Sequence, residues 1–355
     1  MIVWTAIFCF LLTLVLTPLV KRLAIKIGAV DKPNQRKVHQ RIMPRLGGLA
    51  IYLSTMAGLL IAMPMLNDVQ NSVSIWPILI GATIIIITGV LDDMYELSPK
   101  VKLTGQIMAA VIVILGGVKV EFINLPFGGE LNLGLMAVPL TFFWIIGITN
   151  AINLIDGLDG LAAGVSSIVL LTISTMAVLM GNTFVIIIGL ILLASTVGFL
   201  FYNFHPAKIF MGDTGALFLG FMISVISILG FKNITVFSLL LPAIILGVPI
   251  SDTLFAIIRR IVQKKPLSAP DKSHLHHCLL RLGFSHRKTV LIIYGMSALF
   301  GIAAIVLSKA TLWSGVLIIT LLLISIQFVA EKIGLIHENF QPMHNFVRKL
   351  ANTRR

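Results

Sequence analysis

The stretch IWPILIGATIIIITGVLDDMY, residues 75–95, is apolar for most of its length and ends near two adjacent carboxylates, Asp92 and Asp93. About 20 apolar residues in a helix are enough to cross the ~30 Å hydrocarbon core of a bilayer. The stretch therefore predicts a membrane-spanning helix with two negative charges at one end. Because a carboxylate near hydrocarbon is costly, the pair indicates a function at that end of the helix.

The rest of the chain repeats this apolar pattern. Of its 355 residues, 57% are hydrophobic and 12% are charged, and the mean hydropathy is +1.01, which is outside the range of soluble domains. We expect an all-α integral membrane protein with about eleven transmembrane helices. The apolar stretches begin near Ile2, Gly48, Ile75, Leu103, Met136, Leu161, Thr183, Ala216, Val236, Val290 and Leu312.

Basic residues predict the orientation in the membrane. The loops after the odd-numbered spans hold all but three of the 27 Lys and Arg, the exceptions being Lys119, Lys232 and Lys309. Since cytoplasmic loops carry the excess of Lys and Arg, we expect the N-terminus outside and a basic cytoplasmic C-terminal tail at residues 331–355. The net charge of +13 then suits anionic lipids and anionic substrates. Nucleic acid is not expected as a partner, because its binding would need a soluble domain.

Six aspartates gather at the predicted cytoplasmic ends of spans 3, 5, 7 and 9. They are Asp92, Asp93, Asp156, Asp159, Asp213 and Asp252. Capping is an alternative for Asp213, because Asp is a favoured helix N-cap. A helix N-terminus also binds phosphate, and the polar residues nearby, Asn203, His205, Lys208 and Phe210, exceed what a cap requires. The cluster therefore favours a functional site.

Two more polar stretches lie on the same side. In NAINLIDGLD, residues 150–159, polar side chains recur every three residues, which is the spacing of one helical face. The stretch HLHH, residues 274–277, suggests a metal at first sight, but zinc sites usually combine His with Cys or Glu at other spacings. Contacts from these histidines to a sugar or a phosphate are the better interpretation.

Taken together, these motifs resemble the polyprenyl-phosphate N-acetylhexosamine-1-phosphate transferases, the MraY/WecA family, and most closely its TagO-type branch. The resemblance runs from the first loop through span 9, in the order of the family. The stretches that carry it are DKPNQRKVHQRIMPRLGG (31–48), GVLDDMYELSPKVKLTGQ (89–106), GITNAINLIDGLDGLAAG (147–164), FHPAKIFMGDTGALFLG (204–220), GVPISDT (247–253) and DKSHLHHCL (271–279).

The resemblance implies transfer of GlcNAc-1-phosphate from UDP-GlcNAc to undecaprenyl phosphate, with release of UMP, as the first membrane step of a cell-wall polymer such as wall teichoic acid. Residues 1–330 would be a single polytopic catalytic domain in a bacterial plasma membrane, with its active site on the cytoplasmic face. The family also implies Mg²⁺, with Mn²⁺ as the alternative ion, and a homodimer.

The same resemblance implies roles for individual residues. Asp92, Asp93 and Asp213 would be catalytic, with Asp213 holding the metal, Asp92 as the candidate base and Asp93 supporting the metal or its neighbours. The substrate-binding residues would be Lys102 at the phosphate, Phe210 on the uracil, Asn153, Asp156, Asp159 and Asn203 around the uridine, and His274, His276 and His277 near the sugar or diphosphate.

The sequence also predicts two features of the fold. Residues 118–134 predict a small external hairpin between spans 4 and 5, and Pro242, Gly247 and Pro249 predict a broken span 9.

The identity of the donor sugar stays open among UDP-N-acetylhexosamines. An ion-coupled transporter would also have broken helices and buried carboxylates, but its site would lie near the middle of the membrane, whereas these acids gather at one interface.

Overall fold

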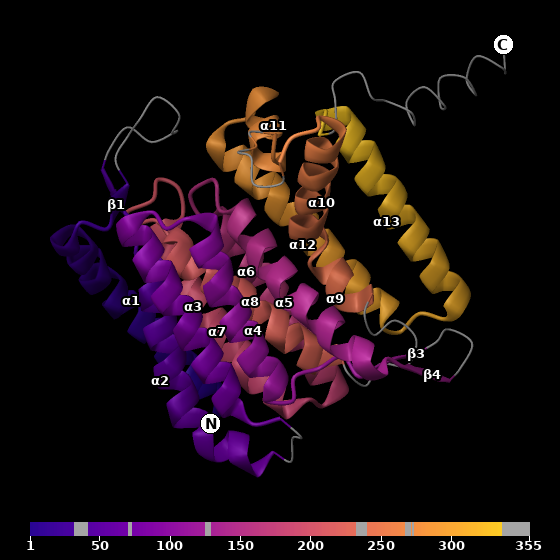
Figure 1. Ribbon diagram of the computed structural model, residues 1–355, viewed down its shortest axis with the longest axis horizontal. Coiled ribbons are helices and arrows are strands. Elements are labelled where there is room, and N and C mark those ends of the chain that lie inside the picture. The colour runs from indigo at the N-terminus through magenta and orange to yellow at the C-terminus, as the bar shows by residue number, and fades with distance from the viewer. Residues whose placement is uncertain are drawn as a thin grey trace.

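The computed structural model describes residues 1–31, 42–69, 73–124, 129–231, 240–266, 271 and 273–335, and these form an almost entirely helical molecule (Figure 1). The long helices of the first half are α1 (Ile2–Ile27), α2 (Gly47–Asp68), α3 (Ile75–Tyr95), α4 (Pro99–Leu115), α5 (Ala137–Ile155) and α6 (Leu161–Met180). Those that follow are α7 (Thr183–Asn203), α8 (Gly212–Phe231), α9 (Leu240–Ile245), α10 (Gly247–Val262), α11 (Leu275–Arg281), α12 (His286–Leu307) and α13 (Leu312–Ile333).

Nine helices in the described part of the chain are long and apolar enough to cross a membrane. This confirms the predicted class, an all-α protein of the multi-span membrane type. The remaining two expected spans correspond to α4, which has 17 residues, and to the pair α9 and α10, which has 6 and 16 residues. The total of eleven spans and their orientation remain predictions.

Helix α8 is the centre of the bundle. Of the 18 consecutive residues of α8 that are most apolar, 94% are buried. The helix packs against α2, α3, α5 and α6. Glycines permit this close packing: a Cβ on Gly48 would lie 2.0 Å from the backbone nitrogen of Gly215, and a Cβ on Gly220 would lie 2.7 Å from the Cα of Thr149. Small residues at such crossings let helix backbones approach closely. The N-terminus of α8 is thereby fixed against two neighbouring helices.

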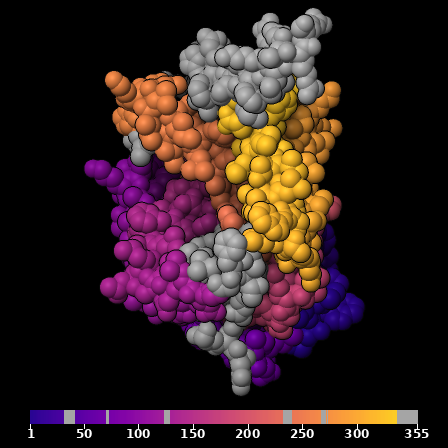
Figure 2. Space-filling model, turned by 90° about the vertical axis from the view of Figure 1, so that its right-hand side faces the viewer, coloured from indigo at the N-terminus to yellow at the C-terminus, as the bar shows by residue number. Residues whose placement is uncertain are grey.

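Helix α13 is the opposite case. Only 6% of its 18 most apolar consecutive residues are buried. Figure 2 shows that the helix lies along one face of the molecule. Its outer face is formed by large apolar side chains such as Trp313 and Leu317, and the hydroxyl of Thr320 donates to the carbonyl of Val316 at 2.7 Å. A surface that is apolar and internally hydrogen-bonded suits contact with lipid.

Two short hairpins lie at opposite ends of the bundle (Figure 1). Strands β3 (Phe122–Asn124) and β4 (Glu130–Asn132) pair antiparallel, which confirms the hairpin predicted between spans 4 and 5. Strands β1 (Val30–Asp31) and β2 (Met43–Pro44) also pair, and this hairpin was not expected from the sequence. Figure 1 places β1 at the same end as α11, and β3 and β4 at the end of the N-terminus.

The expected break in span 9 is present within the described residues. Helix α9 ends at Ile245 and α10 begins at Gly247, with Pro242 inside α9 and Pro249 in the first turn of α10. Proline lacks the amide hydrogen that would continue a helix, so its placement accounts for the interruption. The expected start of this span, at Val236, lies outside the described residues.

Candidate functional site

A cavity of about 430 Å³ opens at the end of the bundle where β1 and α11 lie. Its volume is within the range of small-molecule sites. Its wall is formed by the α5–α6 connection (residues 156–159), the α7–α8 connection, the first hairpin and the starts of α11 and α12. Five charged side chains contribute to that wall, namely Asp31, Arg45, Asp156, Asp159 and Asp213.

Lys102 joins two of the predicted catalytic aspartates at the edge of this cavity. Its ammonium nitrogen lies 2.6 Å from Oδ2 of Asp92 and 2.5 Å from Oδ2 of Asp213. The other Asp92 oxygen accepts a hydrogen bond of 2.8 Å from the amide of Leu97. Residues that are far apart in the sequence, on α3, α4 and α8, thus form one cluster. The ammonium ion compensates carboxylates that would otherwise repel each other.

Asp93 points away from Asp92 and caps α8. Its Oδ1 accepts from the amide of Asp213 at 3.1 Å, and its Oδ2 accepts from the amide and the hydroxyl of Thr214 at 3.0 and 2.6 Å. Free amides at a helix N-terminus need such acceptors, and a carboxylate there also interacts favourably with the helix dipole. Asp93 therefore fixes the start of α8, where Asp213 lies, and its expected support of a metal stays a prediction.

Glycine is required where α8 begins. Gly212 has a φ of +72°, and a Cβ there would lie 2.0 Å from the carbonyl oxygen of Arg45 and 2.2 Å from Oδ2 of Asp93. A Cβ on Gly89 of α3 would lie 2.5 Å from the Cα of Thr214. The GDTG stretch therefore combines a left-handed turn with close backbone contact, and only glycine satisfies both at Gly212.

Arg45 is a site residue that the sequence interpretation did not single out. Its Nε lies 3.4 Å from Asp93, and its Nη1 lies 3.8 Å from both Asp31 and Glu96. Burial acts to lower the pKa of Arg45, but Asp93, Asp31 and Asp213 outweigh it and raise the pKa, so the guanidinium stays charged. The signal was its place within the PRLGG stretch, residues 44–48, whereas the neighbouring basic residues Arg36, Lys37, His39 and Arg41 lie outside the described residues.

Asp156 and Asp159 lie in the connection between α5 and α6, and both line the cavity. Burial, followed by the charges of Asp213, Asp93 and Asp159, raises the pKa of Asp156 to about 8. Asp159 is held by two contacts from its Oδ2, one of 2.8 Å to Nδ1 of His205 and one of 3.1 Å to the amide of Ala207. A cation close to these carboxylates would favour their charged forms.

Asn203 and Phe210 lie on either side of the cavity wall contributed by the α7–α8 connection. The Asn203 side chain already accepts from the amide of Gly160 at 3.1 Å and donates to the carbonyl of Ile209 at 3.0 Å. It therefore links the two loops that form the cavity, and its predicted contact with uridine remains untested. Phe210 is held through its backbone, with bonds to Pro44 and Gly47. Asn153 lies near the end of α5 and is not among the residues that line the cavity.

The three histidines of the HLHH stretch have different surroundings. His274 bonds Asp252 at 2.9 Å, and the other Asp252 oxygen accepts from the amide of Leu275 at 2.8 Å. His276 is buried, and neither of its ring nitrogens has a hydrogen-bond partner among the described residues. Burial, with His277 beside it, lowers the pKa of His276 to about 3. Only His277 of the three lines the cavity.

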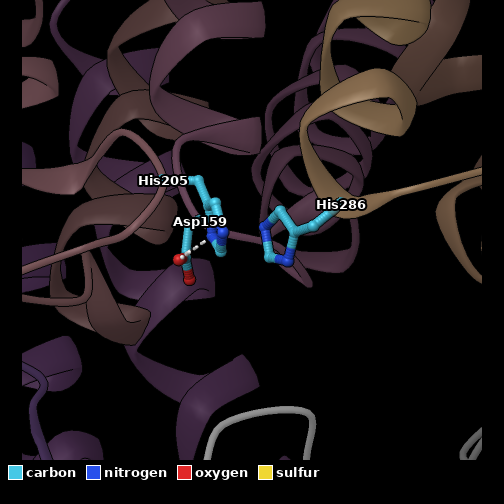
Figure 3. A group of neighbouring side chains, drawn as sticks. All are labelled: Asp159, His205 and His286. Atoms are coloured by element: carbon cyan, nitrogen blue, oxygen red, sulfur yellow. Dashed lines mark hydrogen bonds and ion pairs between the residues drawn. The ribbon is translucent and has the colours of Figure 1, made fainter.

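His286, the first residue of α12, completes the cavity wall and was not predicted from the sequence. Its ring stacks on that of His205, with centroids 4.2 Å apart and planes 24° apart. Figure 3 shows these two rings face to face beside the carboxylate of Asp159. No local signal marks His286, since it follows an unremarkable turn and reaches the cavity only through the packing of α12.

Comparisons with known proteins agree with this architecture. Residues 75–231, which include Asp92, Asp93, Lys102 and Asp213, match the family model described as Glycosyl transferase family 4. The chain is 54% identical over 352 residues to a Bacillus subtilis protein named probable undecaprenyl-phosphate N-acetylglucosaminyl 1-phosphate transferase. That alignment covers 99% of this chain and 97% of the relative.

More distant relatives have related names. A decaprenyl-phosphate N-acetylglucosaminephosphotransferase of Mycolicibacterium smegmatis is 37% identical over 311 residues, covering 80% of this chain and 76% of the relative. An undecaprenyl-phosphate alpha-N-acetylglucosaminyl 1-phosphate transferase of Escherichia coli K12 is 29% identical over 297 residues, covering 82% and 79%. The similarity thus extends well beyond the segment that matches the family model.

Proposed function

Since the chain belongs to the family of polyprenyl-phosphate N-acetylhexosamine-1-phosphate transferases, we propose that it transfers GlcNAc-1-phosphate from UDP-GlcNAc to undecaprenyl phosphate. The products would be UMP and undecaprenyl-diphosphate-GlcNAc. The names of the relatives support both the donor sugar and the lipid acceptor. Another UDP-N-acetylhexosamine is the alternative donor.

One observation carries the assignment to this cavity: Asp213 lines it at the N-terminus of the most buried helix and shares the Lys102 ammonium with Asp92. A diphosphate that enters would meet the Arg45 guanidinium in the cavity wall, and the Lys102 ammonium lies beside Asp213 at the N-terminus of α8. These groups are placed to stabilise negative charge on the transferring phosphate.

The donor set of the cavity fits a magnesium ion. Asp213 and Asp156 supply carboxylate oxygens in the cavity wall, and neither Cys9 nor Cys278 is among the described residues that line it. Mg²⁺ prefers one or two carboxylates together with substrate phosphate oxygens, and Mn²⁺ accepts the same ligands. Asp213 would hold the ion, which when bound supplies positive charge to the diphosphate.

The residues of the chain would then bind and orient the two substrates. Phe210 would stack on the uracil, and Asp156, Asp159 and Asn203 would surround the uridine. His277 would contact the sugar or the diphosphate, while His274 and His276 would position it from behind. Asn153 would act at the edge of the uridine site rather than in the wall of the cavity.

The reaction would be an in-line attack by an oxygen of the lipid phosphate on the β-phosphorus of the donor. The bond between that phosphorus and the oxygen of UMP breaks, and UMP leaves with the electron pair. At pH 7 the acceptor is mostly dianionic, because its second pKa is near 6, so Asp92 has little proton transfer to perform as a base. Most of the rate enhancement would come from positioning and charge, as in phosphoryl transfer generally.

The location of the site suits a soluble nucleotide sugar and a lipid. We assign the cavity to the cytoplasmic face of a bacterial plasma membrane, because the basic loops predict that this face is cytoplasmic. We also propose that the chain crosses the membrane eleven times. The break between α9 and α10 would admit the prenyl chain from the lipid. We also propose that the protein forms a homodimer and acts in the synthesis of wall teichoic acid.

Product analysis tests this function. Purified protein in detergent, with Mg²⁺, undecaprenyl phosphate and UDP-GlcNAc, should release UMP and form one lipid-linked sugar per UMP. UDP-GalNAc in parallel tests the sugar. The absence of UMP with every UDP-sugar, together with ion flux in proteoliposomes, would replace the transferase by the transporter alternative.

A further inference from the structure

Three side chains of types that ligate metals meet in the wall of the cavity. Asp159 comes from the α5–α6 connection, His205 follows the end of α7, and His286 begins α12 (Figure 3). One carboxylate oxygen and one nitrogen from each imidazole lie within 4.8 Å of one another. Such a cluster of one carboxylate and two imidazoles, from three separate elements, is found only where tertiary packing brings them together.

The cluster is held in place by contacts outside it. Asp159 accepts from the amide of Ala207 at 3.1 Å, and Arg287 donates to the carbonyl of His205 at 3.2 Å. The hydroxyl of Tyr294, two turns further along α12, donates to the carbonyl of Gly160 at 2.5 Å. The start of α12 is therefore tied to both of the other segments. Such supporting contacts orient the ligands of a metal site.

One nitrogen of the cluster lacks a hydrogen-bond partner among the described residues. Nε2 of His286 is buried and has no hydrogen-bond partner among the described residues, whereas Nδ1 of His205 bonds Asp159. A buried imidazole nitrogen without a partner loses its hydrogen bond to water without compensation. A metal cation that accepts the lone pair of this nitrogen would remove that cost.

From these observations we propose that Asp159, His205 and His286 bind a first-row transition-metal cation such as Zn²⁺. Imidazole suits Zn²⁺, Co²⁺ and Ni²⁺, whereas Mg²⁺ prefers oxygen ligands alone. Ligand atoms on one metal lie about 3 Å apart, as follows from metal–ligand bonds of ~2.0–2.1 Å, so rotation of an imidazole must close part of the 4.8 Å span. Water would fill the remaining positions on the cation.

This site differs from the proposed magnesium site. Asp213 is paired with Lys102 and offers oxygen ligands, while the histidine cluster offers two nitrogens. All three members of the cluster line the same cavity as Phe210 and Asp213. A cation bound by them would occupy space next to Asp159, so the cation and the nucleotide should exclude each other. That exclusion rests on the proposed function, whereas metal binding by itself does not.

Cobalt absorption tests the metal site directly. Untagged protein in detergent, first treated with a chelator and then kept in excess Mg²⁺, is titrated with Co²⁺, whose visible d–d bands report nitrogen ligation. We expect one Co²⁺ per chain in the wild type. The variants His205→Ala and His286→Ala should each weaken Co²⁺ binding at least tenfold. His277→Ala is the matched control, because His277 lines the same cavity outside the cluster, and it should bind Co²⁺ as the wild type does.

Two outcomes would overturn the metal site. The first is wild-type protein that develops no d–d bands. The second is binding that survives in both cluster variants but is lost in His277→Ala, which would move the metal to the HLHH stretch. Thermal unfolding of each variant, with a midpoint close to that of the wild type, shows that a lost signal reflects a lost ligand.

Addition of UMP tests the exclusion separately. UMP at saturating concentration should weaken Co²⁺ binding at least tenfold, and Zn²⁺ should inhibit UMP release competitively with UDP-GlcNAc. UMP could leave the Co²⁺ titration of the wild type unchanged while the cluster variants still lose Co²⁺ binding. In that case the metal site stands and the placement of the nucleotide beside Asp159 fails.

Discussion

The start of α8 and two histidines of α11 and α12, His276 and His286, differ in how their polar atoms are paired. At α8, each aspartate has a partner within the chain: Asp92 and Asp213 share Lys102, and Asp93 accepts from Asp213 and Thr214. In the two histidines, by contrast, both nitrogens of His276 and one nitrogen of His286 have no hydrogen-bond partner among the described residues.

This difference separates two kinds of site. A cluster with its own counter-ions is built by the fold and is ready to act on a ligand, because its groups are already held in place. Buried nitrogens without partners instead await a ligand to complete them. On this account α8 supplies the chemistry, and the rest of the cavity supplies the binding.

The largest effect should follow loss of the α8 carboxylate. Asp213→Asn should lower transfer by on the order of 10²- to 10³-fold, because it removes the proposed metal ligand and the partner of Lys102. The rate of UMP release is the measurement. Asp68→Asn at the C-terminal end of α2 is the control and should keep the wild-type rate. Near-normal transfer by Asp213→Asn, with the usual dependence on Mg²⁺, would contradict the role of α8.

A smaller loss should follow removal of the cap. Thr214→Val deletes a hydroxyl that bonds the charged Asp93 at 2.6 Å. Hydrogen bonds to charged groups contribute about 1.5–3 kcal/mol, so we expect about a 10- to 100-fold loss of kcat. KM for UDP-GlcNAc should change little if Thr214 acts only through Asp213. Thr214→Ser keeps the hydroxyl and should retain most of the activity. Equal losses in the Val and Ser variants would show that packing, not the cap, matters.

The nucleotide contact should have an intermediate effect on binding and a small one on kcat. Phe210→Ala should weaken UMP binding by about 1–3 kcal/mol if the ring stacks on uracil. Calorimetry of UMP binding measures this change. Phe201→Ala, on the exposed face of α7, is the matched control and should bind UMP normally. An unchanged Kd in Phe210→Ala would place the uracil elsewhere in the cavity.

The smallest effect concerns pH and the stability of metal-free protein. The pKa of Asp156 is raised to about 8 from an ordinary value of 3.8. The stability linked to its proton is therefore fully present below about pH 4 and is lost as the pH rises to about 8. Asp156→Asn removes that dependence, so in EDTA it should be more stable than the wild type at pH 8–9.

Thermal unfolding between pH 4 and pH 9 checks this prediction. The two proteins should differ least at the acid end, and the advantage of the Asn variant should grow toward pH 8. Asn203→Asp is not a suitable control, because Asn203 bonds both cavity loops. Asp68→Asn, which is distant from the cluster, should follow the wild type at every pH. A constant offset for Asp156→Asn across the range would exclude titration of Asp156 as the cause.

Much of the fold follows from local sequence. Long apolar stretches predicted the helices, Pro242 and Pro249 predicted the break, and Gly129 with its alternating neighbours predicted the β3–β4 hairpin. Each of these signals lies within a few residues of the feature it determines. The β1–β2 pair, by contrast, has only two residues in each strand, too few for an alternating pattern to be detected.

The candidate site was predicted as a list of residues but not as an arrangement. The sequence gathered Asp92, Asp156 and Asp213 on one side through the positive-inside rule. It could not indicate that Asp93 caps α8, nor that Arg45 and His286 complete the cavity. Those relations depend on helix packing between segments about 50 to 200 residues apart, which no local pattern encodes.

Crystals of the protein with Mn²⁺ and UMP would test the central claim most directly, since anomalous scattering locates Mn²⁺ without assumption about its ligands. The account predicts an anomalous peak at the Asp213 carboxylate, next to a UMP phosphate oxygen, with the uracil ring on Phe210. A peak at the Asp159, His205 and His286 cluster without one at Asp213, or UMP bound outside the cavity, would contradict it.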